Sequence, residues 1–198
     1  MFVNLNMQRI NKIFLLIVLF IFTGCIKRTS ILDISDADIH YFNELISRPG
    51  EEVRFFPSYD NVSLACTVMR PDKPSNGVVL FIHGLGARAN LYLTMADEFV
   101  ANGYIMYLLD IRGHGNSHGV SGHMPSSNSM EKDINHFYEY VFSIEGSNQK
   151  YIAIGHSLGT YVWVNTLVSS DIDLDALVLI SGGSINNLDK FSALKENI

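Results

Sequence analysis

The residues best suited to chemistry are a run of five, Gly155-His156-Ser157-Leu158-Gly159. This G-x-S-x-G pattern places a serine on a sharp turn between a strand and a helix. Glycine at both flanks lets the backbone turn without a Cβ meeting the neighbouring strand and helix. A serine hydroxyl is a weak nucleophile at neutral pH unless a base takes its proton. The pattern therefore predicts that Ser157 is a nucleophile for acyl transfer, provided that a base is supplied.

The segments around this run are those that such a turn requires. Residues 150–154 form a short apolar run, which is typical of a buried parallel strand. Residues 160–169 continue without Gly or Pro and are expected to form a buried helix. A strand, a tight turn and a helix follow one another, so a chance match of the short pattern is disfavoured.

The general base is harder to find than the nucleophile. In folds that use this turn, the triad follows the order Ser, then Asp or Glu, then His, and no histidine follows His156. A substitute drawn from the histidines elsewhere in the chain stays open, because triads are defined by geometry. Metal ligation by His114, His118 and His123 is disfavoured, since no Cys or carboxylate spacing supports it. The acidic residues after the serine are interpreted as solvated loop carboxylates: Asp171, Asp173, Asp175 and Asp189.

The elements that must position Ser157 alternate along the chain. Strands are predicted at 53–56, 63–69, 78–82, 104–109, 150–154 and 176–180, and helices at 91–101, 129–144 and 160–169. The first two strands flank a turn at residues 58–61, and residues 70–77 have the composition of a loop. Alternating strands and helices imply right-handed crossovers and a mainly parallel sheet, hence an α/β fold in one domain.

Two further motifs precede the serine, each directly after a predicted strand. They are His83-Gly84-Leu85-Gly86 and Asp110-Ile111-Arg112-Gly113-His114-Gly115-Asn116-Ser117. Together with the run at Ser157 they resemble the α/β-hydrolase family, in its monoacylglycerol lipase, lysophospholipase and serine aminopeptidase-like branch. The resemblance spans residues 51–182. It implies an eight-stranded, mostly parallel sheet, a cap inserted near residues 181–183, and hydrolysis of an ester or amide.

The resemblance also assigns roles near Ser157. The N–H of Leu158, the residue after the nucleophile, is expected to donate to the oxyanion of the tetrahedral intermediate. By resemblance the second donor is the N–H of Leu85, and His83 and His114 hold loops by hydrogen bonds. The family places its acid and its histidine beyond the last predicted strand. Residues 51–198 are therefore interpreted as the N-terminal part of a hydrolase domain that lacks the C-terminal strands, with residues 176–180 as an exposed edge.

The N-terminus carries a different signal. Arg9 and Lys12 precede ten apolar residues, 13–22, a stretch too short for a comfortable membrane span. Thr23-Gly24-Cys25 follows and resembles a bacterial lipobox, so residues 1–24 are predicted to be a lipoprotein signal peptide and Cys25 to be lipidated. An uncleaved anchor or an ordinary secretory signal are the alternatives. Residues 25–50 are predicted to be a tether with a short helix at 36–46.

The composition of the chain limits the classes of binding partner that are expected. The formal charge of the 198 residues is −6, and no basic cluster is present, which argues against nucleic acid. Of the two cysteines, Cys66 is interpreted as a buried strand residue. No cofactor or metal is predicted. The expected partners are a small ester, lipid or peptide substrate and, through Cys25, a membrane of the bacterial cell envelope.

Two functions from different classes remain open on the sequence. The first is a serine esterase or lipase-like hydrolase that acts through an acyl-enzyme on Ser157 and is inactive in this 198-residue form. The second is a non-catalytic surface lipoprotein, or pseudoenzyme remnant, that retains the hydrolase fold.

Overall fold

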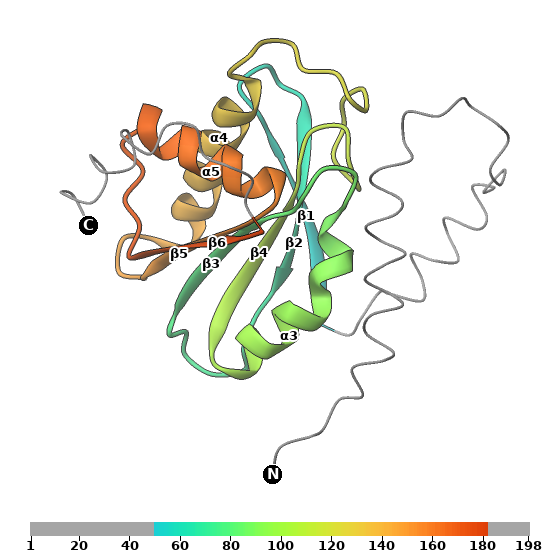
Figure 1. The fold of residues 1–198 in the computed structure, drawn as a ribbon. Helices are drawn as coiled ribbons and strands as arrows, with labels where there is room; N and C mark the ends of the chain where they lie inside the picture. Colours follow the sequence, from blue (N-terminus) through green and yellow to red (C-terminus); the bar gives the residue numbers. More distant parts are fainter. Residues whose placement is uncertain (1–49, 182–198) are drawn as a thin grey trace, which may run out of the picture. The chain divides into compact units, whose positions relative to one another are not determined.

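A computed structural model of the chain describes residues 50–181 (Figure 1). The predicted signal peptide, Cys25 and all but the last residue of the predicted tether lie outside these residues. The described part begins with a hairpin of β1 (Glu51–Pro57) and β2 (Ser63–Met69), joined by the predicted turn. Asn61 takes a positive φ of 63° in that turn, a conformation that asparagine tolerates better than most residues.

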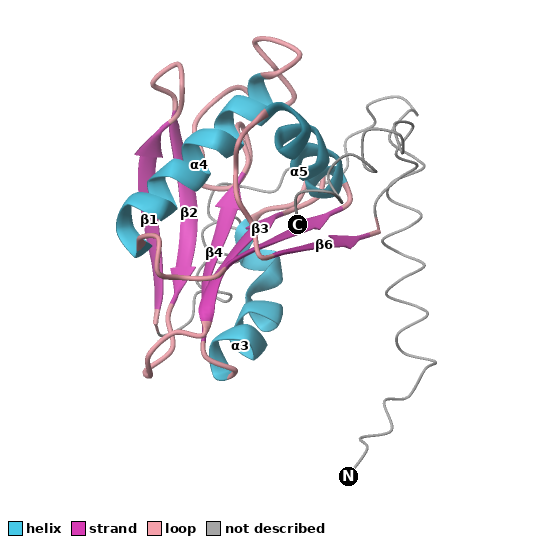
Figure 2. Cartoon of the chain, turned by 90° about the vertical axis from the view of Figure 1, so that its left-hand side faces the viewer, coloured by secondary structure: helices cyan, strands magenta, loops and turns pink. Residues whose placement is uncertain are grey.

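Six strands form one sheet in the order β1-β2-β4-β3-β5-β6 (Figure 2). The remaining strands are β3 (Gly77–Ile82), β4 (Tyr104–Asp110), β5 (Tyr151–His156) and β6 (Ala176–Ile180). β1 and β4 each pair antiparallel with β2, whereas the β3–β4, β3–β5 and β5–β6 pairs are parallel. The expected mostly parallel sheet is thereby confirmed.

Helices cover both faces of the sheet (Figure 2). On one face, α4 (Ser129–Glu145) and α5 (Leu158–Ser169) pack on one core, which contains Phe137 and Trp163. On the other face, α3 (Leu93–Ala101) closes a second core with Phe81. Alternate residues of β3 enter the two cores, since successive strand side chains point to opposite faces. β3 is buried along its whole length, as its continuous apolar sequence predicted.

The predicted elements match the structure closely, with small shifts at their ends. β6 has the predicted bounds, and α4 extends the predicted helix by one residue. The helix expected at 91–101 is instead a 3-10 turn, η1 (Ala89–Tyr92), followed by α3. The reason is a side chain far away in sequence, Asp110, whose Oδ1 accepts the N–H of Ala89 at 2.7 Å and fixes the start of the turn.

Cys66 lies in β2 and is fully buried with a free thiol, as predicted. Burial raises the pKa of this thiol to about 12. A thiol held protonated is unreactive, so its role is packing. Among the helices of residues 50–181, none is long and apolar enough to cross a membrane.

Candidate active site

Ser157 lies on a strained turn at the carboxyl end of β5. Its backbone has φ 52° and ψ −111°, and the next residue begins α5. A positive φ is uncommon for a residue with a Cβ and costs roughly 1–3 kcal/mol, which the surrounding structure must offset. The serine is exposed beyond the strand.

The two glycines of the motif explain how the turn fits. A Cβ on Gly159 would lie 2.2 Å from the carbonyl oxygen of Ile82 in β3. A Cβ on Gly155 would lie 2.6 Å from backbone atoms of Gly159 and Thr160. Since no real Cβ comes this close to backbone, both positions require glycine, as the sequence predicted.

The last strand, β6, holds the turn from the other side. The N–H of Ser157 donates to the carbonyl of Ile180 at 2.9 Å. The hydroxyl of Thr160 donates to the carbonyl of Gly155 at 3.0 Å and also lies 3.3 Å from that of Ile180. Thr160 is buried, so these bonds are shielded from water. The conformation of the nucleophile therefore depends on β6.

The loop after β3 lies against the serine. A Cβ on Gly84 would come within 3.2 Å of Ser157 Cβ, a tight contact, so a larger residue here would require the loop or the serine to shift by a few tenths of an ångström. Leu85, the next residue, is 74% exposed, and Leu158 is the first residue of α5. N–H groups in the first turn of a helix have no partner within the helix, which leaves the Leu158 N–H free of such a bond. The structure thus brings the segments of both predicted oxyanion donors to Ser157.

Two histidines hold these loops together, as predicted. His83 is fully buried, and its Nε2 accepts the N–H of Ile111 at 3.1 Å. The proton is consequently on Nδ1, which donates to the carbonyl of Gly84 at 2.7 Å. Burial lowers the pKa of His83 to about 4, so the ring is neutral at pH 7. His114 Nε2 accepts the N–H of Gly86 at 3.3 Å and links the same loop to the segment after β4.

Asp110 at the end of β4 holds two segments in place, the start of η1 and the segment that follows β4. Its carboxylate accepts the N–H groups of Ala89 and Asn116 at 2.7 and 2.8 Å. Burial raises the pKa of Asp110, because desolvation disfavours its charge. Gly115 leaves the room for this carboxylate, since a Cβ there would lie 2.2 Å from Asp110 Cγ.

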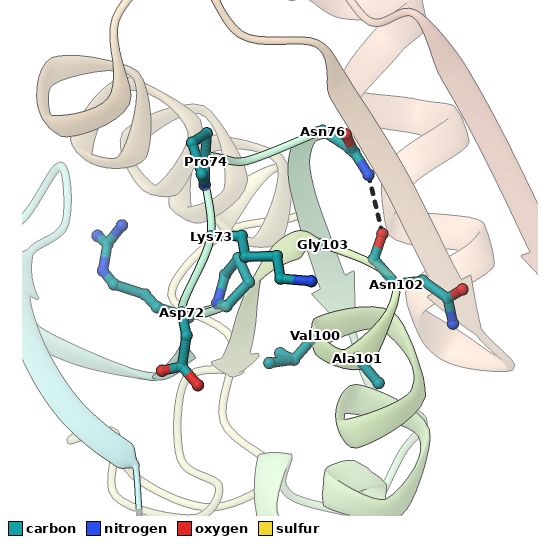
Figure 3. A pocket seen from close by; sticks show the side chains of 10 residues that line it. Asp72, Lys73, Pro74, Asn76, Val100, Ala101, Asn102 and Gly103 are labelled. Carbon is teal, nitrogen blue, oxygen red and sulfur yellow. Dashed lines mark hydrogen bonds between the residues drawn. The ribbon is translucent and has the colours of Figure 1, made fainter.

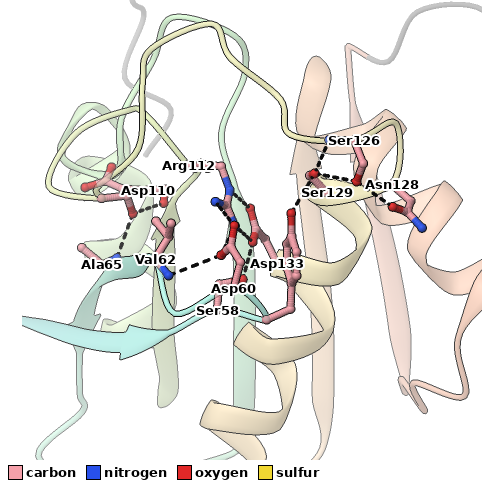
Figure 4. Close-up of polar contacts among 12 residues, drawn as sticks. Ser58, Asp60, Val62, Ala65, Asp110, Arg112, Ser126, Asn128, Ser129 and Asp133 are labelled. Atoms are coloured by element: carbon pink, nitrogen blue, oxygen red, sulfur yellow. Dashed lines mark hydrogen bonds and ion pairs between the residues drawn. The ribbon is translucent and has the colours of Figure 1, made fainter.

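A buried ion-pair network, which the sequence did not predict, lies beside this segment (Figure 4). Arg112 donates from Nε and Nη2 to Asp133 of α4 at 2.9 and 2.6 Å. Its Nη1 and Nη2 also bind Asp60 of the β1–β2 turn at 2.7 and 2.9 Å, and Ser58 donates to Asp133. Arg112 lies in the predicted motif, but its partners are 52 and 21 residues away, and no local pattern marks them.

The other predicted residues are placed as follows. His118 and His123 are exposed in the loop between β4 and α4, and His136 is half-buried in α4. Asp175 is exposed but accepts the N–H of Tyr151 at 2.8 Å, so it fixes the start of β5 and is not simply solvated. Asp189 lies outside the described residues. Within residues 50–181, no group of three or more His, Cys, Asp or Glu residues is arranged to hold a metal ion.

A separate groove of about 470 Å³ lies at the opposite end of the sheet (Figure 3). Asn76 and Gly103, which line it, precede β3 and β4, whereas Ser157 follows the carboxyl end of the parallel strand β5. The side chain of Asn76 donates to the carbonyl of Asn102 at 2.9 Å. Lys73 and Asp72 also line the groove. The groove is therefore remote from the serine.

The sequence profile of the serine aminopeptidase S33 family (Hydrolase_4) matches residues 73–194, more than half of the chain. The chain belongs to this family. Its fold is the α/β-hydrolase fold, in agreement with the sheet order and the three motifs described above.

Similarities to individual proteins agree with this family assignment. A monoacylglycerol lipase of Mycolicibacterium smegmatis is 30% identical over 143 residues, 69% of this chain and 48% of that enzyme. Protein phosphatase methylesterase 1 of Schizosaccharomyces pombe is 29% identical over 126 residues, 61% of this chain and 34% of that protein. A thermostable carboxyl esterase of Bacillus coagulans, solved with glycerol, superposes with a TM-score of 0.60 at 20% identity, covering 76% of this chain and 50% of that structure. The chain thus spans half or less of the length of these relatives.

Proposed function

We propose that Ser157 is the nucleophile of a carboxylic ester hydrolase, with lipid esters as the favoured substrate class. The observation that carries this proposal is the strained conformation of Ser157, held at a strand-to-helix junction directly against the Gly84 loop. The names of the sequence relatives, a monoacylglycerol lipase and a methylesterase, favour an ester over an amide.

The proposed reaction follows from the groups at the site. Ser157 Oγ forms a bond to the ester carbonyl carbon, and its proton passes to a general base. The negative charge on the carbonyl oxygen is stabilised by the N–H groups of Leu85 and Leu158. Removing one such donor typically costs a factor of roughly 10²–10³ in rate. The C–O bond to the alcohol then breaks, the alcohol takes the proton, and water hydrolyses the acyl-enzyme.

The general base for this reaction is not assigned to any residue of 157–198. Family order places it after the acid that follows a later strand, and residues 157–198 contain no histidine. We therefore propose that the 198-residue form has at most a slow residual activity, of the kind an oxyanion hole alone supports. The same observation favours a second candidate function, a non-catalytic lipoprotein that retains the fold.

A fluorophosphonate probe tests the serine. The 198-residue chain is incubated with the probe, and the adduct at Ser157 is measured by intact mass, with Ser157→Ala as the control. Slow labelling that the control abolishes is expected. Supplying the C-terminal half of a family relative, fused in frame, is expected to accelerate labelling and produce ester hydrolysis. If the fusion folds and Ser157 still fails to react, the non-catalytic function is the correct one.

The anchor is a separate proposal. We propose that Cys25 is lipidated and attaches the protein to the bacterial cell envelope. Expression with radiolabelled palmitate is expected to label the wild-type chain, whereas Cys25→Ala is expected to remain an unlabelled and uncleaved precursor. Normal processing of the Cys25→Ala chain would identify an ordinary secretory signal instead.

A further inference from the structure

The residue directly before the nucleophile, His156, is bound by a tyrosine from another part of the chain. Tyr92 Oη lies 2.9 Å from His156 Nδ1, and the two ring centroids are 5.7 Å apart. Tyr92 ends η1, the 3-10 turn that follows the Gly84 loop. The Tyr92 ring itself packs on Phe81 of β3, with 4.5 Å between centroids. The hydroxyl is therefore presented from a ring anchored in the core.

The His156 ring also lies against the Gly84 loop. A Cβ on Gly84 would be 3.1 Å from His156 Nδ1 and 3.2 Å from Ser157 Cβ. The same imidazole edge thus contacts Tyr92 on one side and the loop on the other. A Cβ-sized group at Gly84 would already make a tight contact with the imidazole, so rotation of the His156 ring toward Gly84 is expected to displace this loop from the serine.

We infer that Tyr92 and His156 form a positioning pair that sets the separation of the two oxyanion donors, the N–H groups of Leu85 and Leu158. The inference rests on the proposed function of Ser157. Oxyanion donors must lie 2.7–3.1 Å from the developing charge, so displacement of the loop weakens one of them. The pair acts through the backbone of Gly84 and Ser157 and is assigned no contact with the substrate.

A purely structural role for Tyr92 leads to a different expectation. The ring accounts for the packing on Phe81, and phenylalanine would preserve it. If Tyr92 only filled the core, Tyr92→Phe would alter neither the reactivity of Ser157 nor the protection of the loop. If the hydroxyl orients His156, Tyr92→Phe changes both the reactivity of Ser157 and the protection of the loop, while the packing on Phe81 is preserved.

The test uses four single variants and one double variant of the full 198-residue chain, and it measures the rate of fluorophosphonate labelling at Ser157. In this step a P–O bond to Ser157 forms, fluoride leaves and the hydroxyl proton passes to solvent. Tyr92→Phe and His156→Leu are each expected to slow labelling about tenfold, a fraction of the loss of a whole donor. His156→Asn is expected to restore most of the rate, because its Oδ1 occupies the position of Nδ1. The control is Tyr104→Phe, at the opposite end of the sheet.

The double variant Tyr92→Phe/His156→Leu is expected to be no slower than the slower single variant, because each substitution removes the same hydrogen bond between Tyr92 Oη and His156 Nδ1. Additive losses would overturn the inference, as would an unchanged rate in Tyr92→Phe.

Hydrogen–deuterium exchange of the peptide 83–91 provides a readout that does not depend on Ser157 reactivity. Faster exchange in Tyr92→Phe and His156→Leu, but not in His156→Asn, supports the positioning pair. If wild-type Ser157 is unreactive in the folded chain and in its fusion, the proposed function fails, whereas the exchange result still decides whether the pair positions the loop. Unchanged exchange of this peptide in all variants would overturn the inference that Tyr92 and His156 position the loop.

Discussion

The two edges of the described sheet are built differently. Edge strand β1 carries Glu51, Glu52, Arg54 and Pro57, and the turn that follows it is fixed to α4 through Arg112. β6 at the other edge reads Ala-Leu-Val-Leu-Ile and has no charged residue. Charges and proline are common means by which edge strands avoid pairing with other chains. β1 therefore has the composition of an edge strand, whereas β6 has that of an interior one.

The difference is also visible in what holds each edge. The β1 side is fixed by charged side chains that were brought together from three separate segments. The β6 side is held by its parallel pairing with β5, by the bonds to the carbonyl of Ile180, and by the Asp175 carboxylate, which accepts the N–H of Tyr151. The side that carries the nucleophile is thus held mainly through backbone groups within residues 50–181. Four experiments test this comparison.

Asp133→Asn is expected to have the largest effect. It replaces a buried carboxylate that accepts two bonds from Arg112, and breaking a buried pair of this kind costs about 3 kcal/mol. Chemical denaturation measures the free energy of unfolding. The control, Glu52→Gln, removes an exposed ion pair to Arg54 and is expected to cost less than about 0.5 kcal/mol. Equal losses in both variants would mean that the buried network does not stabilise the β1 side.

Val178→Lys tests the composition of β6. We expect residues 26–198 to self-associate through this edge, and a lysine there to weaken association about tenfold, since charged side chains disfavour edge pairing. Val53→Lys in β1 is the matched control, because the two valines are similarly exposed, at 43% and 37%. Sedimentation velocity measures the distribution of species. A monomeric wild-type chain, or equal effects of the two lysines, would contradict the comparison.

Thr160→Val removes the hydroxyl that binds the carbonyls of Gly155 and Ile180. The expected loss is about 1 kcal/mol, together with faster hydrogen exchange in β6. Thr166→Val is the matched control in the same helix, because the Thr166 hydroxyl binds only the carbonyl of Val162 in the bonds described. If both variants leave β6 exchange unchanged, Thr160 does not secure this edge.

The smallest expected effect is that of pH on Asp60. Its bonds to Arg112 lower the pKa of this carboxyl below its usual value. A lowered pKa in the folded state means that the stabilisation is present above the unfolded pKa, about 4, and is lost as the pH falls through the folded value. The difference in Tm between wild type and Asp60→Asn is therefore expected to shrink between pH 5 and pH 2. A constant difference would show that Asp60 contributes through shape rather than charge.

The sequence predicted much of this molecule because its signals are local. Apolar runs predicted β3 and β6. The motif around Ser157 predicted the turn, the need for its two glycines and the change from strand to helix. What it did not predict depends on contacts between distant segments. Tyr92 meets His156 across 64 residues, and Asp60 meets Arg112 across 52. Such pairs leave no periodic trace, and only the assembled sheet brings them together.

The bond from Ser157 to Ile180 has a consequence for the nascent chain. The serine leaves the ribosome 23 residues before its acceptor carbonyl does. At about 5–20 residues per second, this interval is roughly 1–5 s. During that time the residues of the motif have all been synthesised, but the Ser157 N–H does not yet have its acceptor carbonyl on Ile180. The reactive conformation is thus acquired late in synthesis, when the following strand joins the sheet.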